Sequence, residues 1–398
     1  MFLKKIQKRN PELIEKAFYL HRKNILEPNT YILDLDQIQA NAALMARSAS
    51  DNNVVLYFMS KQLGRNPLVA QAVVEAGIEK AVAVDPWEAR TLAQAGIKLG
   101  NVGHLVQVPT SMLAEMVSYK PEIMTVYSFE KARKISELAL KQNSVQPIML
   151  RIYSKDSFNY EGQTGGFSLE NLDKIVSNLT ELEGIEIKGL TAFPCFLFNY
   201  KTKKIETTPN LDLVIRTGKI LNKKYDLEIE QLNTPSVNCQ KTIPMLAEAG
   251  ATHGEPGHAL TGTTPYHAHY NQGEKPAMLY LSEISHLKNE SAYTFGGGFY
   301  SRSHLKNALV GGDDYQKNSR IYPASQPDSE MIDYYASLDN VDNDLKIGDT
   351  VLYAFRTQIF VTRSQVAVIS GIHNGKLKLQ GIYNSQGQLL DKKEEISL

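Results

Sequence analysis

Apolar residues along the chain recur with two periods, and segments of the two kinds alternate. Short runs rich in β-branched residues, typical of buried strands, are separated by segments in which apolar positions recur every three to four residues, as in amphipathic helices. The first run of this repeating unit is "VVLYFM". The eight predicted strands cover residues 54–59, 80–85, 101–108, 122–127, 147–153, 185–193, 228–234 and 251–257.

The segments between these strands carry helix start and stop signals. Pro67, Pro86 and Pro109 stand where a first helical turn is expected, and Gly77 and Gly96 follow two of the helical segments. Alternating βα units favour a parallel sheet, and eight of them fit a (β/α)8 TIM barrel. A doubly wound open sheet is the alternative, but no G-x-G-x-x-G motif follows the first strand.

The pattern changes at both ends of the barrel segment. After residue 270 the chain reads as short strands with Gly, Asn and Asp turns, as in "DTVLYAFRTQIFVTRSQVAVISGIHN". Residues 1–28 read as one charged amphipathic helix. We therefore predict an N-terminal helical extension over residues 1–28, a barrel over 29–270 and a mostly β C-terminal domain over 271–398.

Composition excludes several classes of partner. Lys+Arg and Asp+Glu number 43 each, which argues against a nucleic-acid-binding face and against a polybasic membrane surface. No apolar run is long enough to span a membrane, and the N-terminus lacks the apolar core of a secretory signal. Cys195 and Cys239 imply no disulfide framework, so we predict a cytoplasmic protein. We also predict a small-molecule substrate.

Lys61 follows the first predicted strand, at the end where barrel enzymes place their chemistry. Desolvation at such a position favours the neutral amine, which attacks carbonyl groups and forms Schiff bases with an aldehyde substrate or with pyridoxal phosphate. Two alternatives remain open. Lys61 is either a solvated residue that ends a strand, or the nucleophile of an aldolase that needs no cofactor.

Two later strand ends suit the phosphate and the ring of pyridoxal phosphate. "NTPSVNC" offers the hydroxyl groups of Thr234 and Ser236, and "GEPGH" offers the backbone amides of Gly257 and His258. A carboxylate at Glu255 would keep the pyridine nitrogen protonated. The alternatives are ordinary turn chemistry and an exposed carboxylate at the barrel rim.

Taken together, these motifs resemble the fold type III pyridoxal-phosphate enzymes of the alanine-racemase type, in the YhfX-like branch. The resemblance implies pyridoxal 5'-phosphate bound as an aldimine on Lys61, with Glu255 at the pyridinium and Gly257 at the phosphate. It also implies a homodimer whose sites use both subunits. The motifs that carry it are "NTYILDLDQIQANA", "YFMSKQLG", "DPWEARTLAQAGI", "GLTAF" and "EPGHALTG".

The sequence departs from the family pattern at three positions. Ala192 stands where the family commonly has a His stacked on the ring, so Phe193 or a residue of another strand would take that place. Glu255 replaces the Arg that racemases often have near the pyridine nitrogen. His258 replaces the Arg of the related decarboxylases.

The C-terminal domain supplies two further candidates by the same resemblance. Tyr300 in "YTFGGGFYSR" would be the acid–base group opposite the lysine, supplied by the partner subunit; the alternative is an interface tyrosine in a Gly-rich hairpin. Arg356 in "AFRTQIFVTR" would bind a substrate carboxylate, and the alternative is an arginine on the sheet surface. His267 and His269 in "PYHAHY" have a spacing that suits a metal in an extended segment. We interpret them as linker histidines and predict no metal.

The predicted function is a pyridoxal-phosphate-dependent amino-acid racemase or epimerase, an isomerase acting at Cα. Because Glu255 strengthens the electron sink, a lyase or decarboxylase is the alternative within the family. A pyridoxal-phosphate-binding protein of cofactor homeostasis is the alternative outside catalysis, although such relatives lack a β domain.

Overall fold

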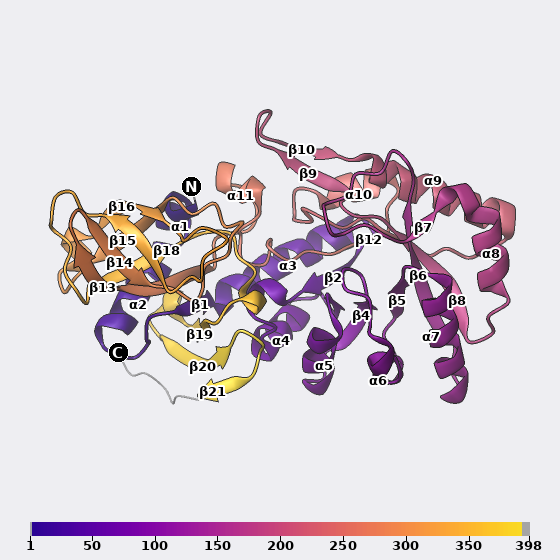
Figure 1. The fold of residues 1–398 in the computed structure, drawn as a ribbon, viewed down its shortest axis with the longest axis horizontal. Coiled ribbons are helices and arrows are strands. Elements are labelled where there is room, and N and C mark those ends of the chain that lie inside the picture. Colours follow the sequence, from indigo (N-terminus) through magenta and orange to yellow (C-terminus); the bar gives the residue numbers. More distant parts are fainter. Residues whose placement is uncertain (1, 392–398) are drawn as a thin grey trace. The chain divides into compact units, whose positions relative to one another are not determined.

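The structure is a computed structural model that describes residues 2–391. The chain divides into two compact units. Residues 42–60 and 73–259 form one, called the barrel unit, and the other described residues form the second, called the β unit. Figure 1 shows the elements of both units along the chain. Two helices, α3 (Leu35–Asp51) and α4 (Pro67–Glu75), contain residues of both units.

The barrel unit confirms the predicted (β/α)8 barrel. Its parallel strands pair in the order β5-β4-β3-β2-β12-β11-β8-β6, and a further pairing between β5 and β6 closes the ring. A short strand, β7 (Phe167–Ser168), pairs with β6, and β9 (Phe196–Asn199) forms a hairpin with β10 (Lys204–Thr207). The barrel strands are β2 (Val55–Met59), β3 (Lys80–Ala83), β4 (Lys98–Val102), β5 (Ile123–Val126), β6 (Gln146–Tyr153), β8 (Ile185–Thr191), β11 (Gln231–Asn233) and β12 (His253–Gly254).

Helices follow the barrel strands and pack against them. α5, for example, contacts β3 and β4, and α9 contacts β8 and β11. Local signals explain where α5 begins: Asp85 accepts a hydrogen bond from the Glu88 amide at 2.8 Å, and Pro86 occupies the first turn. The other helices of this unit are α6 (Leu113–Ser118), α7 (Phe129–Lys141), α8 (Leu172–Thr180) and α10 (Ile243–Ala249), with α5 at Pro86–Gln94 and α9 at Pro209–Tyr225.

Two glycines shape strand β4. A side chain at Gly100 would clash with the ring of Tyr57, which is fully buried. Gly103 has φ +93°, and a Cβ there would lie 2.7 Å from the carbonyl oxygen of Thr125. The chain therefore turns at Gly103 and the strand ends at residue 102, so the predicted strand over residues 101–108 was placed too late. His104 lies beyond the strand.

The β unit confirms a mostly β second domain. Its ten-stranded sheet has the order β14-β17-β16-β15-β18-β13-β1-β19-β20-β21. β1, from the N-terminal part of the chain, pairs antiparallel with β13 and parallel with β19. The strands are β1 (Thr30–Asp34), β13 (Met278–Lys288), β14 (Ser291–Phe295), β15 (Asn307–Gly311), β16 (Arg320–Ser325), β17 (Tyr335–Asp339), β18 (Thr350–Tyr353), β19 (Gln365–Ser370), β20 (Lys378–Asn384) and β21 (Leu389–Asp391).

The N-terminal segment forms two helices rather than the single helix predicted. α1 (Phe2–Arg9) ends before Asn10, whose side chain caps α2 (Pro11–Arg22) with Pro11 in the first turn. The apolar faces of both helices, including Leu3, Ile6 and Leu13, are buried in the core of the β unit. Asn10–Pro11 is the sequence signal for this break.

Within residues 2–391, no helix combines the length and the apolar character needed to cross a lipid bilayer.

Candidate active site

A buried carboxylate lies at the end of strand β12. Glu255 follows the strand directly and is 4% exposed. Its Oε1 accepts hydrogen bonds from the side-chain amides of Asn101, at 3.0 Å, and Asn233, at 2.8 Å. The Thr125 hydroxyl donates to the Asn101 oxygen at 2.8 Å, which fixes the orientation of that amide. Two donors on one oxygen stabilise the charged form of the carboxylate.

His104 lies on the other oxygen of this carboxylate. Its Nε2 is 3.3 Å from Oε2 of Glu255, and both side chains are fully buried. The Tyr127 hydroxyl donates to the His104 carbonyl at 2.5 Å. The ring of Phe193 meets the imidazole edge-on, with ring centres 5.8 Å apart. Glu255 and His104 thus form a buried imidazole–carboxylate pair at the ends of the strands.

The loop after β11 carries the predicted phosphate residues and has a strained backbone. Ser236 has φ +94° and Val237 φ +53°, a region that residues with side chains rarely adopt. Asn238 ties this loop to the Glu255 turn: its amide donates to the Thr234 carbonyl at 3.2 Å, and its oxygen accepts from the Glu255 amide at 2.6 Å. The loops after β11 and β12 are therefore fixed to each other.

The structure places the remaining predicted residues of this region as follows. Gly257 is buried and His258 is half-buried, both in the turn that begins with Glu255. The Thr234 hydroxyl lies 3.4 Å from the His253 carbonyl, so it faces backbone. The structure thus brings Thr234, Ser236, Glu255, Gly257 and His258 together on two neighbouring strand ends.

Lys61 lies two residues after the end of β2 and is the first residue of a segment, 61–72, that belongs to the β unit. β2 ends at Met59, whose amide donates to the Pro256 carbonyl at 2.9 Å, so this strand end lies beside the Glu255–Gly257 turn. The Ser60 hydroxyl then donates to Glu88 at 2.6 Å. Lys61 is the next residue and begins the 3-10 turn η1 (Lys61–Leu63).

A row of buried polar atoms crosses three neighbouring barrel strands. Arg151 on β6 pairs in register with Thr191 on β8, which pairs with Asn233 on β11. In the described part of the chain, Nη1 of Arg151, Oγ1 of Thr191 and Oδ1 of Asn233 have no hydrogen-bond partner. The Arg151 guanidinium also lies 5.2 Å from the ring centre of Tyr127. Buried polar atoms without partners are costly, so this row suits a polar ligand.

Tyr300 and Arg356 belong to the β unit. Tyr300 follows the glycine triplet, and its carbonyl accepts from the Ser303 amide at 2.8 Å. Arg356 lies in the segment after β18, outside any strand and between the buried residues Phe355 and Thr357. It is half-buried.

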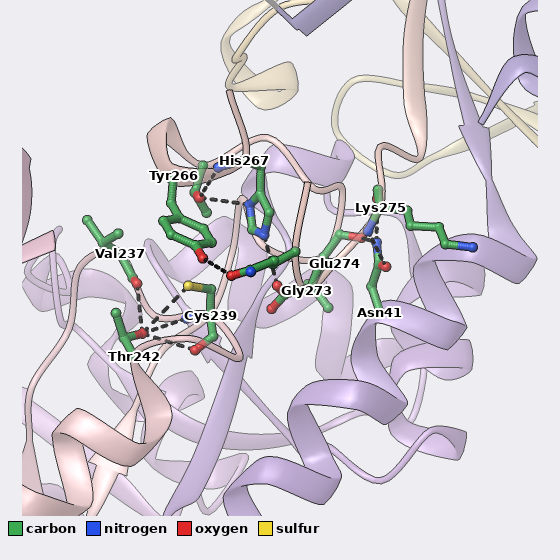
Figure 2. Close-up of polar contacts among 12 residues, drawn as sticks. Asn41, Val237, Cys239, Thr242, Tyr266, His267, Gly273, Glu274 and Lys275 are labelled. Atoms are coloured by element: carbon green, nitrogen blue, oxygen red, sulfur yellow. Dashed lines mark hydrogen bonds and ion pairs between the residues drawn. The ribbon is translucent and has the colours of Figure 1, made fainter. Parts of the chain in front are cut away.

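The segment with His267 and His269 forms a short helix, α11 (Pro265–His269), and not the extended segment predicted. Thr264 caps this helix and Pro265 is in its first turn, a signal the sequence contained. The two ring nitrogens of His267 contact Thr264 at 2.8 Å and Glu274 at 2.9 Å. The contact between His267 and Glu274 is drawn in Figure 2. Among residues 2–391, no group of three or more His, Cys, Asp or Glu side chains is arranged to hold a metal.

Sequence reasoning missed the residues that surround Glu255. Asn101, Asn233 and Asn238 are neutral amides that resemble ordinary strand or turn residues. Only the barrel register places Asn101 and Asn233 side chains on the same carboxylate. His104 falls inside the strand predicted over residues 101–108, which hid the role of Gly103 in turning it toward Glu255.

Family comparisons agree with this architecture. Residues 33–265 match the family described as "Alanine racemase, N-terminal domain", and residues 279–379 match "YhfX-like, C-terminal domain". The chain belongs to the alanine-racemase-like family of fold type III pyridoxal-phosphate enzymes, in its YhfX-like branch. It is similar to the uncharacterized protein YhfX of Escherichia coli, with 40% identity over 98% of this chain and 100% of that protein.

More distant relatives share the family or the fold. An alanine racemase of Clostridium tetani is 26% identical over 66% of each chain. D-threonine aldolase of Filomicrobium marinum superposes with a TM-score of 0.67 at 16% identity, covering 92% of this chain and 96% of that one. An alanine racemase of Clostridium difficile, in complex with cycloserine, has a TM-score of 0.62 at 18% identity, covering 90% and 98%.

Members of this family are pyridoxal-phosphate-dependent enzymes, and the barrel unit has suitable groups for that cofactor. Glu255 is a buried carboxylate at a strand end, held by two amides. The unpartnered polar atoms of Arg151 and Thr191 lie on neighbouring strands. A buried anion with adjacent unused donors fits a ligand that carries both a protonated ring nitrogen and anionic oxygens.

Proposed function

We propose that this protein is a pyridoxal-phosphate-dependent racemase or epimerase of an amino acid. The observation that carries the proposal is the buried Glu255 carboxylate, held on two amides beside the strand that leads to Lys61. When bound, the cofactor supplies an electron sink for the carbanion that forms at Cα.

Lys61 is proposed to hold the cofactor through a covalent bond to its side-chain nitrogen. When it is not bonded to the cofactor, the amine of Lys61 would serve as a general base that takes the proton from Cα of the substrate. Ser60 supports this role, because its hydrogen bond to the buried Glu88 side chain holds the residue before Lys61 in place. Lysine at the C-terminal end of a barrel strand is a recurrent position for such chemistry.

Four residues are proposed to bind the phosphate: Thr234, Ser236, Gly257 and His258. The left-handed backbone at Ser236 supports this, since strain of this kind is concentrated at ligand sites. Gly257 lets backbone approach an anion closely. Because the Thr234 hydroxyl faces the His253 carbonyl, Thr234 would contribute through its position in the turn.

Two residues of the β unit complete the proposal. Tyr300 is proposed as the acid that returns a proton to the opposite face of Cα, and Arg356 as the group that binds the substrate carboxylate. Both roles come from the family resemblance. In that family the tyrosine comes from a second subunit, so the proposal includes a homodimer.

A lyase or decarboxylase is the second candidate, and Glu255 is the observation that favours it. A carboxylate at the ring nitrogen strengthens the electron sink and so assists cleavage of bonds other than Cα–H. The structural neighbours named D-threonine aldolase and D-threo-3-hydroxyaspartate dehydratase, the latter with a TM-score of 0.66 at 14% identity, show that this fold also carries such reactions.

Hydrogen exchange at Cα in D2O separates the candidates. The protein, saturated with pyridoxal phosphate, would be incubated with single enantiomers of a panel of amino acids and followed by NMR and chiral chromatography. A racemase incorporates deuterium at Cα and forms the opposite enantiomer. Release of CO2 or of an aldehyde without the opposite enantiomer would identify the second candidate.

Bound cofactor without any exchange or product, across the whole panel, would contradict both candidates and support a cofactor-binding protein. Lys98→Ala, at the opposite end of a barrel strand, is the matched control for Lys61→Ala in this assay. Exchange that survives Lys61→Ala would remove Lys61 from the mechanism.

A further inference from the structure

Arg151 carries a positive charge into the barrel unit without a carboxylate to balance it. The residue is 2% exposed. Its guanidinium donates to the carbonyls of Gly165 and Gln163, at 3.3 and 2.8 Å, and to the side-chain oxygen of Asn159 at 3.5 Å. These acceptors are all neutral, and no Asp or Glu among residues 2–391 forms an ion pair with Arg151. A buried charge without an opposite charge costs free energy, so the site favours a ligand that supplies an anion.

The strand register places Arg151 on the inner face of the barrel, near its C-terminal mouth. Asn233 faces inward, because its amide binds Glu255. Thr191 pairs in register with Asn233 and with Arg151, so these neighbours line the same face of the sheet. Met149 lies two residues before Arg151 on the same strand, and its sulfur is 3.8 Å from the Asn233 amide nitrogen. Arg151 is therefore one layer closer to the mouth than Met149.

Two buried donors from this layer have no partner in the described part of the chain. They are Nη1 of Arg151 and Oγ1 of Thr191, which come from paired positions on neighbouring strands. Oδ1 of Asn233 also lacks a partner, but it is an acceptor, so an anion is expected at the Arg151 end of the row. A guanidinium N–H beside a hydroxyl is a donor set that suits the oxygens of a carboxylate.

The surroundings hold the guanidinium in place before any ligand binds. The loop that carries Gln163 and Gly165 lies directly on β6, and a Cβ at Gly166 would be 2.4 Å from the Arg151 carbonyl oxygen. On another side, the ring centre of Tyr127 is 5.2 Å from the guanidinium carbon. A donor that is already ordered loses little conformational entropy when it binds an anion.

We propose that Arg151 and Thr191 form a subsite for a carboxylate on the substrate side chain, so that the preferred substrates are acidic amino acids. The inference rests on the proposed function, which assigns the phosphate to the loops after β11 and β12 and the α-carboxylate to Arg356. Neither assignment uses the donors of Arg151 and Thr191. A neutral side chain would leave the buried guanidinium without a counter-charge, whereas a side-chain carboxylate pairs with it.

The test compares amino acids that differ in the charge of the side chain but hardly in its shape. Dissociation constants of aspartate and asparagine, and of glutamate and glutamine, would be measured for both enantiomers by isothermal titration calorimetry. The full-length protein would be saturated with pyridoxal phosphate. In wild type, the acidic member of at least one pair should bind about tenfold more tightly than its amide, or better.

Variants then assign this preference to the subsite. Arg151→Gln should weaken binding of the acidic amino acid about 100-fold and change binding of its amide little, so that the preference is lost. Arg151→Lys keeps the charge and should retain part of the preference. Thr191→Val removes one donor, leaves Arg151 and its loop in place, and should weaken only the acidic member, about threefold. This variant decides the matter if Arg151→Gln fails to fold.

Arg133→Gln is the matched control. Arg133 also belongs to the barrel unit, but it is exposed on α7 and pairs there with Glu137 at 2.7 Å. All four dissociation constants of this variant should equal those of wild type.

Equal binding of acid and amide by wild type, with hydrogen exchange at Cα of neutral amino acids, would overturn the inference and leave the proposed function intact. An equal loss for all four amino acids in Arg151→Gln, with a shifted absorption band of the bound cofactor before any amino acid is added, would also overturn it. Arg151 would then bind the cofactor. Absence of both binding and exchange for every amino acid would contradict the proposed function and the inference with it.

Discussion

The aliphatic core of the β unit and the strand ends of the barrel unit bury different kinds of side chain. The core of the β unit is aliphatic, with Leu279, Leu281 and Leu352 fully buried. Its buried polar atoms include tyrosine hydroxyls with neutral partners, such as Tyr353 with Thr294 at 2.7 Å. The strand ends of the barrel unit bury Glu255 and Arg151, which are 4% and 2% exposed. The β unit also buries two carboxylates, and both have partners: Asp34 accepts from Asn10 at 2.8 Å, and Glu274 lies 2.9 Å from Nε2 of His267.

This difference indicates where function and stability reside. Burying charge costs free energy unless it is paired, and the barrel unit retains buried polar atoms of Arg151 and Thr191 without partners. The core cluster around Leu279, Leu281 and Leu352 contains only apolar side chains and has no such cost, although Oγ1 of Thr30, elsewhere in the β unit, also has no hydrogen-bond partner. We therefore expect changes at the barrel strand ends to alter ligand binding and chemistry, and changes in the β-unit core to alter stability alone.

The largest expected effect comes from Lys61→Ala. Loss of the amine should lower turnover by about 10³-fold, the range of a lost general base, and should abolish the visible absorption of covalently held cofactor. Lys98→Ala should leave both unchanged, because Lys98 is exposed at the start of β4. Equal turnover in the two variants would show that the amine of Lys61 is not the catalytic group.

The converse test is Leu279→Ala in the β-unit core. Removing a fully buried leucine side chain should lower the free energy of unfolding by about 3 kcal/mol, measured by urea denaturation. Cofactor absorption per folded molecule should stay at the wild-type value. A loss of cofactor binding as large as the loss of stability would break the proposed division between the units.

Acid should destabilise the barrel unit through His253. Burial lowers the pKa of His253 to about 4 from its ordinary value of 6.5. The folded protein favours the neutral imidazole of His253. The preference adds its full amount to the free energy of unfolding above pH 6.5, and this amount is lost as the pH falls toward 4. The loss amounts to about 3 kcal/mol.

A pH series of urea denaturation curves measures this loss. Between pH 6.5 and 4, the free energy of unfolding of His253→Gln should fall less steeply than that of wild type. Burial also lowers the pKa of His21 in the β unit to about 4, so the His253→Gln variant retains one group that titrates in the same pH range. An unchanged slope in His253→Gln would show that His253 does not titrate as its burial requires.

The smallest expected effect concerns Asn238, which joins the loops after β11 and β12. Asn238→Ala removes the hydrogen bond from the Glu255 amide and should weaken pyridoxal-phosphate binding about tenfold, or about 1.4 kcal/mol. Asn222→Ala is the control, because Asn222 makes a similar bond to the Ile229 amide at 2.9 Å, within the barrel unit but away from these loops. Equal dissociation constants for the two variants would contradict a role for the joined loops in binding.

Much of the fold followed from the sequence because its signals are local. Alternation of apolar runs with capped helical segments gave the barrel, and the strand ends gave the positions of Lys61 and Glu255. The missed features depend on contacts between distant segments. Asn101 and Asn233 are 132 positions apart, and only the closed barrel register places both amides on one carboxylate.

Two local errors had signals that were available. Asn10–Pro11 marks the break between α1 and α2, and Thr264–Pro265 marks the start of α11. The first segment was interpreted from its charged amphipathic pattern and the second from the spacing of its histidines. The turn at Gly103 is different in kind. A glycine after a strand does not reveal that the next residue, His104, turns toward a carboxylate contributed by another strand.

The central claim is that the amine of Lys61 holds pyridoxal phosphate. Borohydride reduction of the protein saturated with cofactor, followed by proteolysis and mass spectrometry, locates the attached pyridoxyl group. The account predicts one modified peptide, containing Lys61, and its absence from Lys61→Ala. A pyridoxyl group on any other lysine, or bound cofactor that reduction leaves unattached, would contradict it.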